Sequence, residues 1–400
     1  MSPNNTNNTF DKSNGNVKFT DNSPKKITKK RIFITCGIIA LALFILFFVR
    51  SCGDGQSLAS KFKLDVLKIN TGSGFPEDIV GNTVAKNNSA YFDGCYAYIS
   101  DTSFTVLNTT AGEEVSLQHS YASPAFKCSS GKAITYDIGG YDYSVVSING
   151  DSFNKKCENK IYCADISSSG VFGVVTSTSG YMSEASFYNS DGKFIYSYKM
   201  SEYYISALSI DPSGHYCAVA GVSTNGGKLI SCVYILDFTK QEPVHKYVFE
   251  NNTIFDIEYI DNNTVACIGD SEAYVINLRN DDHSVYSYSG KIITACCLTS
   301  KNGIVLSLSS SIDGKNCSLV RIDTNGNVAY ETKTEYYITD VSSYSNTTFA
   351  YAKGNIYAYS PDGTQIRSCK CGNDTKSIVA LSDKSVYTAG ISQISCCNVN

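Results

Sequence analysis

A repeat of roughly 40 residues constrains the fold of this chain more than any other feature of its sequence. Short apolar runs recur, and each follows a segment rich in Gly, Asn, Asp or Ser. Their successive starts are 38, 44, 49, 38, 46 and 39 residues apart. One four-stranded blade of a β-propeller has this length, so the spacing predicts an all-β propeller. The runs begin at Ser123, Ile161, Ile205, Ile254, Ile292, Ile338 and Ser377.

Two families of turns recur at fixed positions within this repeat. Between the first and second strands stand sequences such as SSSG and DPSG, and between the third and fourth stand NSDG, DTNG and SPDG. Asp and Asn bond to their own backbone and Gly accepts a positive φ, so these are hairpin turns. The similar stretches Tyr203–Gly221 and Tyr336–Gly354 are therefore predicted to be equivalent inner hairpins of two blades.

The number of blades depends on how the ring closes. A further unit with the strands AYFDGC and YAYISD precedes Ser123, and the last unit, from Ser377, has room for only three strands. The apolar segment Lys61–Ile69 can supply the missing outer strand, which would remove the open edge of the ring. We expect eight blades closed in this way, and seven blades are the alternative.

One segment stands apart from the repeats. Ile32–Val49 is a run of 18 residues without a charge, long enough to cross a bilayer as a helix. Lys25, Lys26, Lys29, Lys30 and Arg31 precede it, so the N-terminus should stay in the cytoplasm and the rest of the chain outside. A cleaved signal peptide and lipid attachment at Cys52 are the alternatives. Arg50 fits a lipid-attachment site badly.

These features predict four parts. Residues 1–31 form a polar, Asn-rich cytoplasmic tail that is disordered and basic at its end. Residues 32–49 form the transmembrane helix, residues 50–60 a linker, and residues 61–400 an extracytoplasmic propeller in the cell membrane.

Three stretches carry a family resemblance. SGFP stands at Ser73–Pro76, His119–Ser147 combines a Pro-containing strand with a YD-x-GG hairpin, and Tyr181–Tyr198 runs into ISALSIDPSGHYCAVAGVSTNGGKLIS. Here the chain resembles an uncharacterised family of single-pass, membrane-anchored, propeller-like proteins of Gram-positive bacteria. The resemblance implies a WD-repeat-like or quinoprotein-like propeller outside the cytoplasm, and it implies no reaction. The high Cys content departs from that family.

The cysteine pattern and the absence of Trp limit which metal sites and cofactor motifs the chain can contain. The chain has 16 Cys but no C-x-x-C pair, and several Cys sit inside apolar strands, where they behave as small hydrophobes. Disulfides and a metal site are the alternatives. Without Trp, the docking motif of quinone-cofactor propellers and the aspartate boxes of glycan-cleaving propellers are both absent. We expect no cofactor and no metal.

Few residues are candidates for a functional site. Loops that join one blade to the next emerge on one face of a propeller, and Tyr121, Tyr203 and Tyr336 fall in three of them, with His119 nearby. These four are candidates for binding a ligand or partner, since Tyr is favoured at interfaces. Asp256 and Asp340 hold equivalent positions in inner strands and would line the channel. A structural role is the simpler interpretation of both carboxylates.

Two functions remain. The net charge of -4 gives no reason to expect nucleic acid as a partner. The first function is a non-catalytic, membrane-anchored platform at the cell surface that binds an envelope protein or ligand. The second is an envelope enzyme whose site in the central funnel acts on glycan or peptide; it would need polar groups converging near Asp256 and Asp340.

The predicted topology can be tested directly. Protease added to intact, wall-stripped cells should degrade the chain from about Cys52 onward and spare the N-terminal tail, because only the tail is expected inside. Immunoblotting with tags at both ends distinguishes the two parts. Complete protection of the C-terminal tag, with degradation restored by detergent, would contradict the topology.

Overall fold

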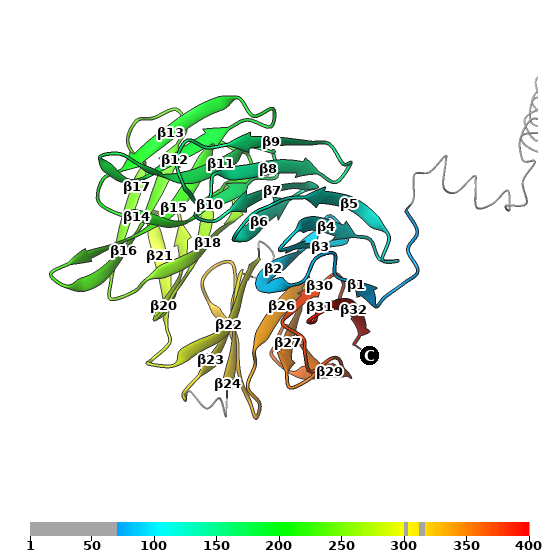
Figure 1. The fold of residues 1–400 in the computed structure, drawn as a ribbon. Helices are drawn as coiled ribbons and strands as arrows, with labels where there is room; N and C mark the ends of the chain where they lie inside the picture. The colour runs from blue at the N-terminus through cyan, green and yellow to red at the C-terminus, as the bar shows by residue number, and fades with distance from the viewer. Residues whose placement is uncertain (1–69, 300–302, 312–316, 400) are drawn as a thin grey trace, which may run out of the picture. The chain divides into compact units, whose positions relative to one another are not determined.

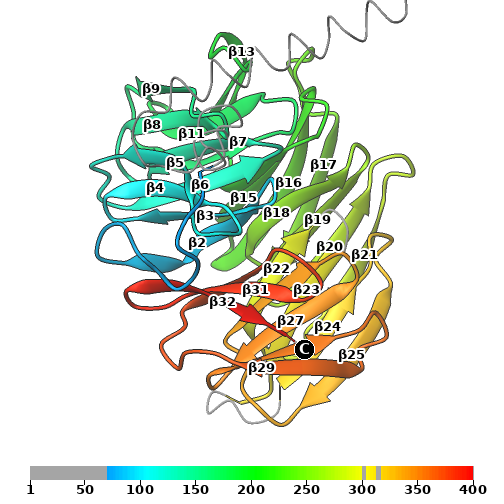
Figure 2. The same ribbon diagram turned by 90° about the vertical axis from the view of Figure 1, so that its right-hand side faces the viewer.

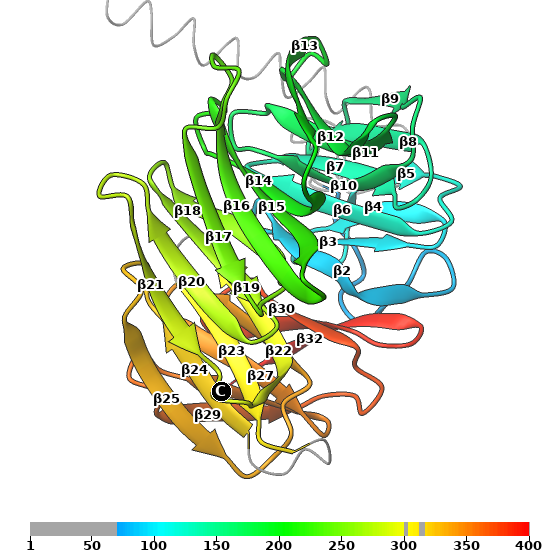
Figure 3. The same ribbon diagram turned by 90° about the vertical axis from the view of Figure 1, so that its left-hand side faces the viewer.

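Eight four-stranded antiparallel sheets contain all the strands of the computed structural model, which describes residues 70–299, 303–311 and 317–399 (Figure 1). Figures 2 and 3 show from opposite sides that the sheets follow one another around a ring, so that the last lies beside the first. The all-β propeller is therefore confirmed. Within the described ranges, no helix has the length and apolar character needed to cross a bilayer. The predicted span Ile32–Val49 lies outside those ranges.

The first seven blades each take four consecutive strands, numbered from the channel outward. Blades one to four are β2 (Val84–Phe92), β3 (Cys95–Ser100), β4 (Ser103–Leu107), β5 (Glu113–Gln118); β6 (Pro124–Ser129), β7 (Lys132–Asp137), β8 (Asp142–Ser147), β9 (Ser152–Lys156); β10 (Ile161–Ile166), β11 (Phe172–Thr178), β12 (Tyr181–Tyr188), β13 (Phe194–Met200); and β14 (Tyr204–Ile210), β15 (Tyr216–Asn225), β16 (Lys228–Asp237), β17 (His245–Glu250).

The remaining blades continue around the ring. Blades five to eight are β18 (Ile254–Asp261), β19 (Thr264–Gly269), β20 (Glu272–Asn277), β21 (Asp282–Ser287); β22 (Ile292–Thr299), β23 (Gly303–Ser309), β24 (Cys317–Ile322), β25 (Val328–Thr334); β26 (Asp340–Tyr344), β27 (Thr347–Ala352), β28 (Asn355–Tyr359), β29 (Gln365–Lys370); and β30 (Ser377–Ala380), β31 (Ser385–Ala389), β32 (Gln393–Asn398), β1 (Glu77–Asp78).

Burial follows the position of a strand within its blade. Middle strands such as β4 and β23 are buried along their whole length, because both faces pack against neighbouring blades. Outer strands such as β25 alternate between buried and exposed residues. The core is accordingly a set of apolar layers between blades, and each layer takes side chains from two successive sheets.

The predicted turns define the two end faces of the ring. In the DPSG turn, the Asp211 carboxylate accepts hydrogen bonds from the backbone nitrogens of His215 and Tyr216 at 2.8 and 2.7 Å, and Gly214 has a φ of +75°. We call the end with the first-to-second and third-to-fourth strand turns the turn face. The opposite end, with the blade-to-blade connections and the second-to-third strand turns, is the linker face.

The ring is closed by strand β1, which confirms eight blades and excludes seven. Glu77 and Asp78 pair with Ile394 and Gln393 of β32, so the N-terminal side supplies the outer strand of the last blade. The prediction that Lys61–Ile69 fills this position was wrong, and that segment lies outside the described residues. A long apolar run is unnecessary, since two anchors beside β1 are enough. Phe75 meets the Tyr387 ring edge-on at 4.8 Å, and Ile79 joins the same buried cluster.

Side chains link the inner strands around the channel. The Asp165 carboxylate on β10 accepts a hydrogen bond from the Ile210 nitrogen at 2.8 Å, and Asp340 on β26 accepts one from the Ile378 nitrogen at 2.7 Å. The Ser209 hydroxyl on β14 accepts a hydrogen bond from the Tyr259 nitrogen on β18 at 2.9 Å. Neighbouring blades are thus joined by side-chain acceptors where no backbone ladder connects them.

The closing strand generates a stability prediction. A chain that begins at residue 70 should keep the melting temperature of the longer chain, whereas one that begins at residue 81 should lose both apolar anchors and the β1 pairing. Losing the half-buried Phe75 and the buried Ile79 should lower the free energy of unfolding by on the order of 4 kcal/mol. Urea unfolding of the two purified chains measures the difference. Equal midpoints would contradict the role of β1.

Asp340 generates a prediction about pH. Burial raises its pKa to about 6, against the usual value near 4. The folded protein therefore binds more protons than the unfolded chain in this window. The stability that protonated Asp340 contributes is fully present below about pH 4 and is lost as the pH rises through about 6. The free energy of unfolding should fall by about 3 kcal/mol in total. Denaturant unfolding across pH 4–7 should show this fall.

Two variants of Asp340 separate charge from hydrogen bonding. Asp340→Asn keeps an oxygen for the Ile378 nitrogen but has no titrating charge, so the fall between pH 4 and 6 should become smaller by the share of Asp340, while the share of Glu258 remains. Asp340→Ala leaves that buried nitrogen without an acceptor and should lose about 1–3 kcal/mol at every pH. An Asn variant with the wild-type pH profile would show that the slope has another source.

Candidate functional site

The central channel is crossed by two lysines. Lys127 on β6 reaches Asp256 on β18, with 3.8 Å between Nζ and Oδ1. Lys86 on β2 reaches the backbone oxygen of Thr294 on β22 at 3.5 Å. Both contacts join blades that are three apart in the ring, so they span the channel instead of linking neighbours.

Three cavities follow one another along the channel. One of about 390 Å³ opens at the linker face and is lined by Phe255, Ile292 and Lys86. A central one of about 800 Å³ has both lysines in its wall. The third, of about 580 Å³, opens at the turn face and is lined by Lys127 and by turns of blades two to five. The lysines therefore mark the boundaries between compartments.

The compartment at the turn face holds more negative than positive charge near Lys127. Asp165, Asp256 and Glu258 all act on this lysine, and Asp256 does most to raise its pKa. Burial, together with Asp165 and Asp256, raises the pKa of Glu258 to about 8 despite the opposing Lys127. The Lys127 side chain is 41% exposed to the cavities, so water screens the ion pair, which contributes at most about 1 kcal/mol.

Asp256 and Asp340 both line the central cavity but have separate partners. Asp256 faces Lys127, whereas Asp340 is buried against the Ile378 nitrogen. Within the described residues, no hydrogen bond joins the two carboxylates. Their arrangement offers two structural contacts and no carboxyl pair acting on one substrate atom.

The four predicted binding residues lie in linker-face loops, but their rings are packed. Tyr203 is only 7% exposed within the layer between blades three and four. The Tyr121 ring stacks on His119 at 4.3 Å, and its hydroxyl lies 3.0 Å from the Ser144 hydroxyl. Tyr336 stacks on Tyr357 at 4.2 Å. Their role in binding a partner stays a prediction.

His119 is held by its neighbours. Its Nδ1 accepts a hydrogen bond from the Tyr121 nitrogen at 3.2 Å, and burial lowers its pKa. Its Nε2 is buried and has no partner in the described part of the chain. The loop therefore holds a neutral imidazole whose second nitrogen is shielded from solvent.

Other apolar side chains on the linker face point outward. Tyr204, directly after Tyr203, is 51% exposed, and Phe255 and Ile292 are 45% and 49% exposed. All three stand at the first or second position of an inner strand. Sequence reasoning missed Phe255 and Ile292 and did not single out Tyr204 from the other tyrosines near blade junctions. The alternation of strand side chains offered a signal: of two adjacent tyrosines, one must point away from the layer.

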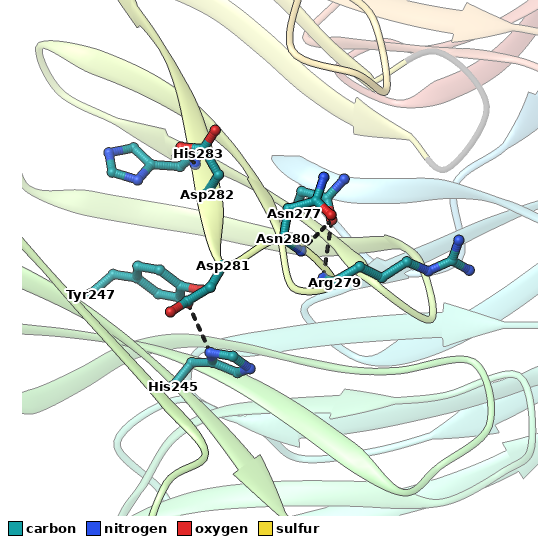
Figure 4. Close-up of polar contacts among 8 residues, drawn as sticks. All are labelled: His245, Tyr247, Asn277, Arg279, Asn280, Asp281, Asp282 and His283. Atoms are coloured by element: carbon teal, nitrogen blue, oxygen red, sulfur yellow. Dashed lines mark hydrogen bonds and ion pairs between the residues drawn. The ribbon is translucent and has the colours of Figure 1, made fainter.

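A polar cluster on the turn face joins blades four and five. Asp281, with a φ of +51°, accepts hydrogen bonds from His245 Nδ1 at 2.9 Å and the Tyr247 hydroxyl at 2.7 Å (Figure 4). These bonds lower the pKa of Asp281, with the larger effect from Tyr247. The His283 ring points away from Asp281 (Figure 4). Its centroid lies 5.7 Å from that of the Phe249 ring.

The same cluster also contains the turn after β20. Asn277 accepts hydrogen bonds from the backbone nitrogens of Arg279 and Asn280 at 3.0 and 3.4 Å. In residues 70–299, 303–311 and 317–399, no three His, Cys, Asp or Glu side chains are placed to hold a metal ion. The cluster is best explained as a link between outer strands.

Solved structures with this fold differ widely in sequence. BamB from Moraxella catarrhalis superimposes with a TM-score of 0.52 at 9% identity, covering 81% of this chain and 100% of that one. Sqt1 from Saccharomyces cerevisiae gives 0.55 at 14% identity, with 83% and 100% covered. The Dos1 propeller gives 0.51 at 15% identity, with 71% and 80% covered. At these identities the likeness concerns the fold alone.

Sequence comparison places the chain more narrowly. No curated protein matches it significantly. Residues 77–394 match a family model described as a family of unknown function, DUF5711. This range begins at the closing strand β1 and ends within β32, the strand with which β1 pairs. The match therefore spans the complete ring, and the chain belongs to the DUF5711 family.

Proposed function

We propose that this protein is a non-catalytic, membrane-anchored platform that binds an envelope protein on its linker face. The observation that carries the proposal is the distribution of exposed apolar side chains. In the described residues 18 large apolar side chains are exposed, and ten of them lie on the linker face. These ten are Val80, Ile138, Tyr141, Tyr181, Met182, Tyr204, Leu229, Phe255, Ile292 and Ile391.

This distribution is unusual for a surface that only meets water. Scattered exposed apolar residues are normal, but a concentration on one face is typical of protein interaction sites. Phe255 and Ile292 also border the cavity at the linker-face mouth, so a partner side chain has a recess to enter. Aromatic and aliphatic anchors beside a recess are the usual carriers of binding energy.

The packed residues beneath this face support the exposed ones. Tyr121, Tyr203, Tyr336 and His119 hold the blade-to-blade loops through stacking and hydrogen bonds. In this proposal they set the shape of the face, and residues such as Tyr204 and Phe255 make the contact.

The anchor and the export of the propeller rest on the sequence. The apolar run Ile32–Val49 with basic residues before it supports a single span with the propeller outside. An enzyme in the funnel has less support, because Asp256 and Asp340 each have a partner of their own.

The proposal can be tested by changing one face at a time. The triple variant Tyr204→Ser, Phe255→Ser and Ile292→Ser should fold normally and lose binding. Anchors of this kind contribute on the order of 2 kcal/mol each, so affinity should fall by at least about tenfold. The partner is first trapped in cells by a photoreactive residue at Ile391 of the full chain, and its affinity for the purified propeller is then measured.

The matched control changes three exposed residues elsewhere. Phe194, Val248 and Val328 have similar exposure but lie on outer strands β13, β17 and β25. Their triple Ser variant should bind the trapped partner like the wild type. Loss of binding in the control with full binding in the linker-face variant would move the site to the outer strands and overturn the proposal.

A further inference from the structure

Three cysteines meet where the seventh and eighth blades adjoin. Cys369 and Cys371 are separated by one residue along β29 and its continuation, so their side chains leave the chain on the same side. Cys397 of β32 lies across from them, with its Sγ 3.9 Å from the Lys370 backbone oxygen between the two. All three pack against the same buried cluster, which includes Phe349 and Ile356.

The three thiols lie near one another, around the Lys370 backbone oxygen and the shared buried cluster. The proximity of Cys369 and Cys371 lowers the pKa of the Cys397 thiol, and that of Cys397 raises the pKa of the other two. All three are only partly buried, so small solutes have access.

We propose that Cys369, Cys371 and Cys397 form a thiol–disulfide exchange site that closes a disulfide between the seventh and eighth blades. The geometry gives each cysteine a role. Cys397 is the nucleophile, because it lies across from both other cysteines and the lowered pKa of its thiol favours the thiolate. Cys369 and Cys371 are alternative resolving thiols, since both leave the chain on the same side and pack against the same cluster as Cys397. The inference does not depend on the proposed partner.

The exchange needs a disulfide as oxidant, such as oxidised glutathione. The Cys397 thiolate attacks one sulfur of that disulfide, forms a mixed disulfide and releases one thiolate. The thiolate of Cys369 or Cys371 then attacks the Cys397 sulfur and releases the second. Two protein thiols lose two electrons and two protons, and the oxidant becomes two thiols.

The neighbouring Cys396 provides an internal control. Residues next to each other in a strand face opposite sides, and Cys396 packs instead against the cluster of the first and eighth blades that contains Tyr387. It belongs to the same strand and is equally partly buried, but it lies outside the trio.

Peptide mapping tests the site directly. The purified full chain is incubated with oxidised glutathione, alkylated without reduction, and digested with trypsin. Cleavage after Arg367, Lys370 and Lys376 places Cys369 in the peptide SCK and Cys371 in CGNDTK. Either peptide should be found linked to the C-terminal peptide through Cys397. Linkage through Cys396, or no linkage after full exchange, would overturn the proposal.

Variants separate the two steps. Cys397→Ser should abolish the link, and Cys396→Ser should leave it intact. The double variant Cys369→Ser and Cys371→Ser should stop at the first step and retain one glutathionyl group on Cys397. If the double variant acquires no adduct there, Cys397 is not the nucleophile and the proposal falls. Stoichiometric zinc that is released only on thiol alkylation would also overturn it.

The disulfide should stabilise the ring near its closure. It would enclose the segment from Cys369 to Cys397, and cross-links over loops of this length restrict the unfolded chain. Oxidation should raise the melting temperature of the wild type by on the order of 5 °C. The Cys397→Ser protein should show no increase under the same treatment, and an equal increase in both would contradict the inter-blade link.

Discussion

The pairing of β1 with β32 is the contact on which the rest of the ring depends. Blades one to seven are each continuous in sequence, so local hairpins suffice to form them. The eighth blade joins segments that are more than 300 residues apart, and its fourth strand is added only when Glu77 and Asp78 reach Ile394 and Gln393. Ser377 and Ser89, whose hydroxyls lie 3.2 Å apart, then join the last inner strand to the first. These contacts bring the first and last inner strands together and complete the ring.

The repeat and its turns could be predicted because their causes are local. Asp211 bonds to the backbone of residues four and five positions later, and that pattern is visible in the sequence. The closing strand could not be located in the same way, since a pairing of two residues has no periodicity. Its anchors are tertiary contacts, such as that between Phe75 and Tyr387. The outer strand was therefore assigned to the longer apolar segment Lys61–Ile69.

The candidate site was predicted at the level of a face but not of a side chain. Position in the repeat placed Tyr203 in a linker-face loop, which is where it lies. Whether it or Tyr204 points to solvent depends on the local register, and β14 contains an irregularity between Ile205 and Ala207. The contact between Lys127 and Asp256 was also out of reach, because it joins blades two and five across the channel. The spacing of the repeats predicts the order of the blades, but it does not predict which side chains meet across the central channel.

The divided channel explains how one propeller can present two different ends. Lys86 and Lys127 separate the mouth lined by Phe255 and Ile292 from the mouth lined by Asp165 and Glu258. The first end has the apolar character that a protein partner needs, whereas charge dominates the second. The raised pKa of Glu258 favours its protonated form, which lowers the negative charge of the cluster around Lys127. Protonation thereby reduces the repulsion among three carboxylates that reach this cluster from β10 of the third blade and β18 of the fifth blade.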